Sequence, residues 1–198
     1  MKKSTRIQTI RNALDGRSVV FVGMMGSGKS AIGRLLAAET GLPYFDSDAE
    51  IVAAADLSIP EIFDRFGEDY FRKGEERVIA RLLAEGPSII SLGGGAFLSE
   101  QTRKEIADHA ISIWLKADID LLLSRVRRRP GTRPLLAIDD PRATLVELVE
   151  KREPVYALAD LHVESSRLSK KQTCDNVVKA LHGWLEKNQT VKVPAEER

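Results

Sequence analysis

Residues 23–30, GMMGSGKS, follow the apolar run SVVFV and match the pattern Gly-x-x-x-x-Gly-Lys-Ser. A β-rich run, this loop and a helical pattern in succession are the context that a phosphate-binding loop requires. Backbone N–H groups of such a loop surround phosphate oxygens, and the N-terminus of the next helix adds partial positive charge. We therefore predict that a nucleoside triphosphate binds at Gly26, Ser27, Gly28, Lys29, Ser30 and Ala31. Lys29 would reach the β- and γ-phosphates, and the Ser30 hydroxyl would ligate Mg²⁺.

Short β-rich apolar runs alternate with longer helical patterns, which favours a parallel sheet covered by helices on both faces. Strands are expected at 18–23, 43–46, 88–92, 110–115 and, less clearly, 161–165. Residues 57–86 predict two helices hinged near Gly67, and residues 172–187 predict a closing helix with apolar residues at core spacing. The fold class expected is therefore α/β, in three layers.

Bulk composition limits both the size of the fold and its partners. The 198 residues suffice for one domain and are too few for two ordinary ones. Because 30 basic and 29 acidic residues leave a net charge of +1, neither nucleic acid nor an anionic membrane is an expected partner. The start of the chain lacks the long apolar segment of a secretory signal. The single cysteine, Cys174, excludes an internal disulfide and suits a reducing compartment, so we expect a buried thiol and a cytoplasmic protein.

Two aspartates follow the second expected strand, in the stretch FDSD at 45–48. On an extended end, Asp46 and Asp48 point the same way, toward the edge of an α/β sheet where ligands bind. We expect Asp46 to bind Mg²⁺ and Asp48 to accept a hydrogen bond from a substrate hydroxyl. The alternative is that Asp46 or Ser47 only caps the next helix, but two carboxylates beside a magnesium site are more than a cap requires.

Three glycines, at 93–95, end the third expected strand at the same edge. They leave backbone N–H groups bare and allow close approach of a ligand, whereas a simple turn would need one glycine or two. Farther along, five arginines fall within residues 125–133, around Pro130 and Gly131. This cluster predicts a mobile lid that lays arginine on phosphate, in preference to a nucleic-acid patch.

Other classes of nucleotide-binding protein fit less well. A GTPase needs an Asn/Thr-Lys-x-Asp guanine reader, which the chain lacks, and its one Asp-x-x-Gly match, residues 64–67, falls in a helical stretch. A motor ATPase usually carries an acidic residue directly after an apolar strand, where this chain has glycines. The three histidines have no metal-ligand spacing. These observations favour a phosphoryl donor site over a switch or a motor.

The motifs taken together resemble the shikimate kinase family, in order and at family-like distances. They are GMMGSGKSAIGRLLA, FDSD, IFDRFGEDYFRKGEE, SLGGGA, RPLL and KREPVY, and the resemblance covers residues 18–185. It implies a nucleoside monophosphate kinase-like P-loop fold, with a five-stranded parallel sheet, a helical substrate-binding subdomain and a mobile lid. It also implies transfer of the γ-phosphate of ATP to the 3-hydroxyl of shikimate, a step toward chorismate and the aromatic amino acids.

The resemblance also implies residue roles. It assigns Lys29 to the phosphates, Ser30 and Asp46 to Mg²⁺, and Arg133 to a lid position that reaches the phosphates on closure. Shikimate is expected at Asp48, Arg72, Gly93, Gly94, Gly95 and Arg152. The catalytic residues would be Lys29, Arg133 and Asp48, with Asp48 orienting or deprotonating the attacking hydroxyl.

Two of these residues suit the acid group of shikimate. Arg72 and Arg152 would clamp the carboxylate, because a planar guanidinium fork matches a planar anion. Glu75, one helical turn beyond Arg72, matches a family acid that braces this arginine. The chain departs from many relatives after PVY, where it reads ALAD, and the residues that contact adenine stay open.

The expected organisation is one kinase domain with short extensions. We expect an extension at 1–17, the kinase domain at 18–186, and a tail at 187–198. Within the domain, the substrate-binding region spans about 48–78 and the lid about 125–140. A monomer is expected because no apolar stripe is left over. The rival functions are a gluconate kinase or another small-metabolite kinase, and a non-catalytic nucleotide-binding module.

Overall fold

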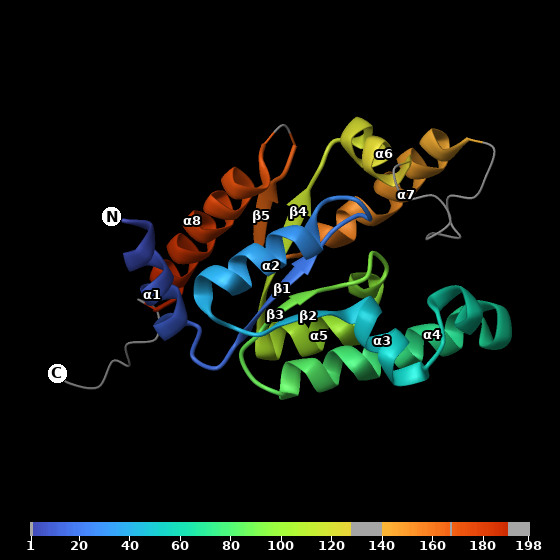
Figure 1. Ribbon diagram of the computed structural model, residues 1–198, viewed down its shortest axis with the longest axis horizontal. Helices are drawn as coiled ribbons and strands as arrows, with labels where there is room; N and C mark the ends of the chain where they lie inside the picture. The colour runs from blue at the N-terminus through green and yellow to red at the C-terminus, as the bar shows by residue number, and fades with distance from the viewer. Residues whose placement is uncertain (1, 128–139, 167, 190–198) are drawn as a thin grey trace.

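A computed structural model describes residues 2–127, 140–166 and 168–189. At its centre lies one five-stranded parallel sheet with the strand order β2-β3-β1-β4-β5 (Figure 1). The strands are β1 (Ser18–Val22), β2 (Tyr44–Asp46), β3 (Ile89–Ser91), β4 (Ala110–Lys116) and β5 (Leu161–Glu164). All five lie where the sequence predicted them, and the α/β prediction is confirmed.

The central strand β1 shows why these runs form a sheet covered on both faces. All five of its residues are buried, as a parallel strand between two layers of helices requires. Successive side chains point to opposite faces: Val19 and Phe21 join one core cluster, and Val20 and Val22 join the other.

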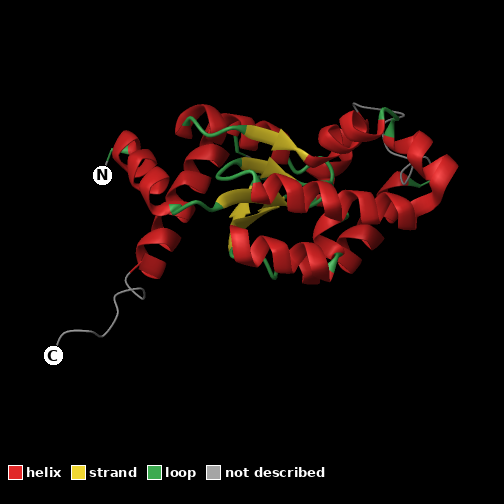
Figure 2. Ribbon diagram, turned by 90° about the horizontal axis from the view of Figure 1, so that it is seen from below, coloured by secondary structure: helices red, strands yellow, loops and turns green. Residues whose placement is uncertain are grey.

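The helices form a layer on each face of the sheet (Figures 1 and 2). One core cluster is closed by α1 (Lys3–Ala13), α2 (Lys29–Thr40) and α8 (Lys170–Gln189). The other is closed by α4 (Ile59–Ala84), α5 (Glu100–His109), α6 (Ile119–Arg127), α7 (Pro141–Tyr156) and the short η1 (Ala96–Leu98). A third, small cluster joins α3 (Ser47–Ala55) to the start of α4. The expected three layers are present.

The long helix α4 bends at the predicted hinge. Ser58 and Glu61 form a capping box at its start, which satisfies two backbone N–H groups. Gly67 has φ 81° and ψ 175°, a conformation that glycine adopts most easily, and this residue kinks the helix. After this kink, the second half of α4 carries Arg72 and Glu75 into the lining of a cavity and then packs Ile79, Leu82 and Leu83 in the core on one face of the sheet.

The first and last described helices reach into the segments that were expected to be extensions. The leading helix α1 buries Ile10 and Leu14 in the same core as α8, and Lys3 contacts both Glu39 and Asp175. Helix α8 continues to Gln189. The exact domain boundaries stay a prediction. Residues 128–139, which include Arg133 and most of the predicted lid, lie outside the described residues.

Candidate active site

One cavity of about 610 Å³ opens at the carboxyl edge of the sheet. Every predicted site residue within the described part of the chain lines it: Gly26 to Ala31, Asp46, Asp48, Arg72, Gly93 to Gly95 and Arg152. The structure therefore brings into one place residues that the sequence spreads over more than half of the chain. Arg133 lies outside the described residues, so its predicted role stays a prediction.

The phosphate-binding loop joins β1 to α2 and points the helix N-terminus at the cavity. Gly28 occupies the N-cap of α2 with φ 106°, and Gly23 has φ 131°, both left-handed values that favour glycine. The buried ammonium of Lys29 donates to the carbonyl oxygens of Gly23, at 2.7 Å, and Met24, at 3.0 Å. These contacts hold a positive charge inside the loop, where phosphate oxygens would need it.

Ser30 and Asp46 lie side by side, as predicted for a metal site. The Ser30 hydroxyl donates to Asp46 Oδ2 at 2.8 Å, and the Tyr44 hydroxyl donates to the same oxygen at 3.3 Å. Asp46 stands at the N-cap of α3 but its side chain makes no capping hydrogen bond, which argues against the capping alternative. Tyr44 was not among the predicted site residues, although it lies two residues before Asp46 on the same strand.

Asp48 reaches the cavity by a different local structure from the one expected. Strand β2 ends at Asp46 and α3 begins at Ser47, so Asp48 lies in the first turn of a helix. The prediction that Asp46 and Asp48 share an extended end was therefore wrong. The Ser47 hydroxyl accepts a hydrogen bond from the Gly93 N–H at 2.9 Å, which ties this helix start to the glycine run.

Charged side chains lie against the backbone of Gly93 and Gly95, which gives these two glycines a reason beyond the predicted approach of a ligand, and that approach stays a prediction. A Cβ at residue 93 would overlap Asp48 Oδ1 and come within 2.9 Å of Glu75 Oε1. A Cβ at residue 95 would lie 2.6 Å from a guanidinium nitrogen of Arg72. Such distances are shorter than van der Waals contact, so glycine lets charged groups from α3 and α4 approach the backbone.

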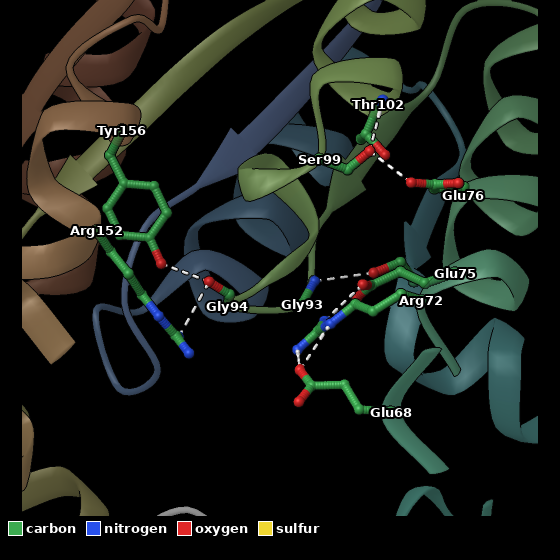
Figure 3. A network of polar contacts seen from close by, with 11 residues as sticks. Glu68, Arg72, Glu75, Glu76, Gly93, Gly94, Ser99, Thr102, Arg152 and Tyr156 are labelled. Carbon is green, nitrogen blue, oxygen red and sulfur yellow. Dashed lines mark hydrogen bonds and ion pairs between the residues drawn. The ribbon is translucent and has the colours of Figure 1, made fainter. Parts of the chain in front are cut away.

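Arg72 lies between two carboxylates on α4 (Figure 3). Its guanidinium donates to Glu75 Oε2 at 2.7 Å and to Glu68 Oε1 at 3.0 Å. Glu75 is only 2% exposed, and this burial raises its pKa, while the Arg72 guanidinium opposes the rise. Burial lowers the pKa of Arg72, but Glu75 and Glu68 outweigh it, so the net shift is upward. The hydrogen-bonded ion pair between Glu75 and Arg72 that the resemblance implied is therefore present.

Arg152 approaches the glycine run from the opposite side (Figure 3). It lies on α7, is 6% exposed, and donates to the Gly94 carbonyl at 3.3 Å. The Tyr156 hydroxyl, four residues farther along α7, donates to the same carbonyl. The sequence analysis did not single out Tyr156, although the motif KREPVY contains it at helical spacing from Arg152.

Arg125 occupies a place that the sequence analysis did not foresee. It was grouped with the lid arginines, but it lies on α6 and donates to the loop carbonyls of Gly26, at 2.8 Å, and Ser27, at 3.1 Å. The Ser165 hydroxyl, after β5, also donates to the Ser27 carbonyl at 3.1 Å. Arg125 and Ser165, from elements far apart in the sequence, thus hold the carbonyl groups of the phosphate-binding loop.

The candidate metal ligands fit a cation that keeps most of its water. Within residues 2–127, 140–166 and 168–189, no three or more His, Cys, Asp or Glu side chains gather as a metal cage. One carboxylate and one hydroxyl beside a phosphate loop match the way Mg²⁺ binds, through few protein oxygens, water and substrate phosphates.

Comparison with known proteins identifies the family. The sequence model of the family described as shikimate kinase matches residues 25–182. This chain belongs to the shikimate kinase family. A shikimate kinase of Bradyrhizobium diazoefficiens is 51% identical over 94% of this chain and 90% of its own length. One of Ruegeria pomeroyi is 55% identical over 83% of this chain and 85% of its own.

Solved structures of the family share the fold. Shikimate kinase from Acinetobacter baumannii, in complex with shikimate, superposes with a TM-score of 0.80 at 28% identity and covers 93% of this chain and 99% of its own. A gluconokinase from Sinorhizobium meliloti, with a TM-score of 0.63 at 18% identity, shares the fold alone. The resemblance inferred from sequence is confirmed. The protein is an ATP-dependent kinase that transfers the γ-phosphate to the 3-hydroxyl of shikimate, in aromatic amino acid biosynthesis.

Proposed function

We propose that the residues lining the cavity perform this transfer in the roles described below. The contact between Gly94 and the phosphate-binding loop is the observation that supports the proposal most strongly. Gly94 lies against the phosphate-binding loop: a Cβ there would be 3.6 Å from the Met25 nitrogen and 4.0 Å from the Gly23 oxygen. The wall that would hold the acceptor therefore touches the loop that would hold the donor. An acceptor on Gly94 has its hydroxyl close to the phosphate that it attacks, and such positioning supplies much of the rate of phosphoryl transfer.

The nucleotide end of the cavity offsets negative charge. Lys29 and the loop N–H groups would contact the phosphate oxygens, and Arg125 and Ser165 hold the loop carbonyls from behind. Mg²⁺, held by Ser30 and Asp46, would neutralise charge on the phosphates when bound. Arg133 would add a further positive charge from the lid.

The acceptor end offers a carboxylate clamp. Arg72 and Arg152 approach the glycine run from opposite sides, so their guanidinium groups can bind the two oxygens of a carboxylate between them. Asp48 would accept a hydrogen bond from the attacking hydroxyl and take its proton. Glu75 keeps Arg72 in place, because its own carboxylate is buried and bonded to that guanidinium.

The protein is further proposed to act as a cytoplasmic monomer. In the described part of the chain, no helix is long and apolar enough to cross a membrane. Exposed large apolar side chains among the described residues are few and mostly scattered: Val52, Phe66, Tyr70, Leu98 and Leu158. Light scattering on a sizing column checks this state; a mass of about twice 21.9 kDa would reject the monomer.

The role of Asp48 is the sharpest test of the proposed site. We expect Asp48→Asn to lower kcat by about 100-fold or more, because a positioned general base contributes that much, while shikimate still binds. Asp64→Asn is the matched control, since Asp64 is exposed and outside the cavity. Turnover of Asp48→Asn within a few fold of wild type would reject the role of Asp48 as a base.

A further inference from the structure

Tyr156 has a buried hydroxyl to which the proposed function assigns no role. It is the last residue of α7 and is 1% exposed, with its ring 6.1 Å from that of Trp114. The hydroxyl donates to the Gly94 carbonyl and lies 3.7 Å from the sulfur of Met24 in the phosphate-binding loop. Burial raises the pKa of this phenol, so it stays a donor at neutral pH.

The carbonyl of Gly94 accepts from two side chains of one helix. Arg152 and Tyr156 are four residues apart, so they share a face of α7, and both reach this single oxygen. A carbonyl oxygen has two lone pairs and can accept both bonds. Both bonds tie α7 to the glycine run, and the tyrosine bond lies about one helical turn beyond the arginine bond, so the two together fix the distance between the helix and this carbonyl.

The sequence between the two residues explains why the helix needs this fixed point. Pro154 lies inside α7. It has no N–H to donate to the carbonyl four residues earlier, and its ring pushes against that carbonyl. The last turn of α7 therefore has one backbone hydrogen bond fewer than an uninterrupted helix. The bond from Tyr156 to the Gly94 carbonyl fixes this turn from outside the helix.

We infer that Tyr156 is a positioning residue for substrate binding: by holding the Gly94 carbonyl, it places the Arg152 guanidinium where a carboxylate can meet it. Without the hydroxyl, only Arg152 of these two side chains would donate to the Gly94 carbonyl, and its guanidinium would move closer to that oxygen. One of its N–H groups would then be turned away from the substrate. The inference rests on the proposed role of Arg152 as half of the clamp.

Tyr156→Phe tests the inference, because it removes the hydroxyl and keeps the ring against Trp114. We expect the Kd and the KM for shikimate to rise about 3- to 10-fold, the usual effect of losing one buried hydrogen bond. The KM for ATP should stay within about twofold and kcat within about threefold, since the loop loses only the weak contact to the Met24 sulfur and keeps those of Lys29, Arg125 and Ser165. Calorimetry with shikimate alone, steady-state kinetics and a melting curve supply the readouts. Tyr70→Phe is the control, because it deletes the same atom from a half-exposed ring outside the cavity.

A lower melting temperature with unchanged shikimate affinity would overturn the inference and leave Tyr156 a packing residue. An equal rise in the KM values for ATP and shikimate would also overturn it. The methyl ester of shikimate, which lacks the negative charge, should bind wild type and Tyr156→Phe within about twofold of one another. A loss of ester binding as large as that of shikimate would show that the carboxylate is not involved.

Arg152→Ala separates this inference from the proposed clamp. If Arg152→Ala weakens shikimate binding and Tyr156→Phe does not, the inference alone fails. If Arg152→Ala leaves shikimate binding unchanged, the clamp fails and the inference falls with it. In the double variant, Tyr156→Phe should add less than about twofold to the effect of Arg152→Ala, because the tyrosine acts through the arginine.

Discussion

The guanidinium of Arg72 occupies the space in which a side chain on Gly95 would begin. A Cβ on that glycine would lie 2.6 to 2.8 Å from three guanidinium atoms, closer than such atoms come in folded proteins. The position of the Arg72 guanidinium therefore depends on Gly95, although the two residues lie 23 positions apart in the chain.

Gly95→Ala should displace Arg72 and weaken shikimate binding. The obstructed atoms are the far end of a flexible side chain, so we expect the fold to survive while the KM for shikimate rises about tenfold or more. The KM for ATP should change little. Gly74→Ala is the control, since a Cβ there meets no atom within 4 Å. Equal kinetics for Gly95→Ala and wild type would contradict the geometry.

The two carboxylates on Arg72 should differ in importance. Glu75 has a side chain 3% exposed, whereas that of Glu68 is 62% exposed, and surface ion pairs contribute little. Glu75→Gln should therefore raise the KM for shikimate about 5- to 50-fold, and Glu68→Gln less than about twofold. Steady-state kinetics on both variants decide the matter; similar effects from the two would count against the brace.

The raised pKa of Glu75 gives a pH test of stability. Its folded pKa lies above the ordinary value of 4.5, so the neutral carboxyl favours the folded state. This contribution is fully present below the unfolded pKa and is lost as the pH rises through the folded pKa. The free energy of unfolding of wild type, relative to Glu75→Gln, should thus fall as the pH rises above about 4.5 and through the raised folded pKa. Urea denaturation measures it, and a relative rise would show that Arg72 outweighs burial.

Asp46→Asn should raise the Mg²⁺ requirement. The change keeps a similar shape and a hydrogen-bond acceptor for Ser30 but removes the charge that attracts a cation. We expect the Mg²⁺ concentration for half-maximal binding of ADP, measured by calorimetry, to rise about tenfold. Asp56→Asn, in the exposed turn after α3, is the control. Unchanged Mg²⁺ dependence would remove Asp46 from the metal site.

Cys174 should resist alkylation in the folded protein. It is fully buried, and burial raises its pKa to about 12, so the reactive thiolate is scarce at pH 8.5. Iodoacetamide should label the protein in urea and leave the native protein unlabelled over the same time, by mass spectrometry. Labelling at similar rates in both conditions would contradict the buried position in α8.

The sequence predicted the strands, the phosphate-binding loop and most site residues because these depend on local patterns. The apolar runs and the loop glycines are contiguous in the sequence. The carboxyl ends of parallel strands meet at one edge of the sheet, so residues that follow different strands could be predicted to lie together. The start of α3 was harder to predict. Strand β2 has only three residues, Tyr44–Asp46, so the sequence pattern does not show that the strand ends and a helix begins at Ser47.

The tasks of Tyr156 and Arg125 could not be read from sequence for a different reason. Both act on backbone carbonyls of distant segments, Gly94 for one and Gly26 for the other. A backbone carbonyl is present at every residue, so no residue type marks its partner. The reason for the glycine run was likewise hidden, because the side chains that need the space come from α3 and α4.

In the proposed reaction, one wall of the cavity brings shikimate to the phosphate held by the loop. A coupled ADP-release assay with Mg·ATP, run with shikimate, with gluconate and without an acceptor, is the decisive measurement. We predict rapid release with shikimate and only slow release in the other two. Release that is the same with and without shikimate, while ATP still binds, would contradict the account.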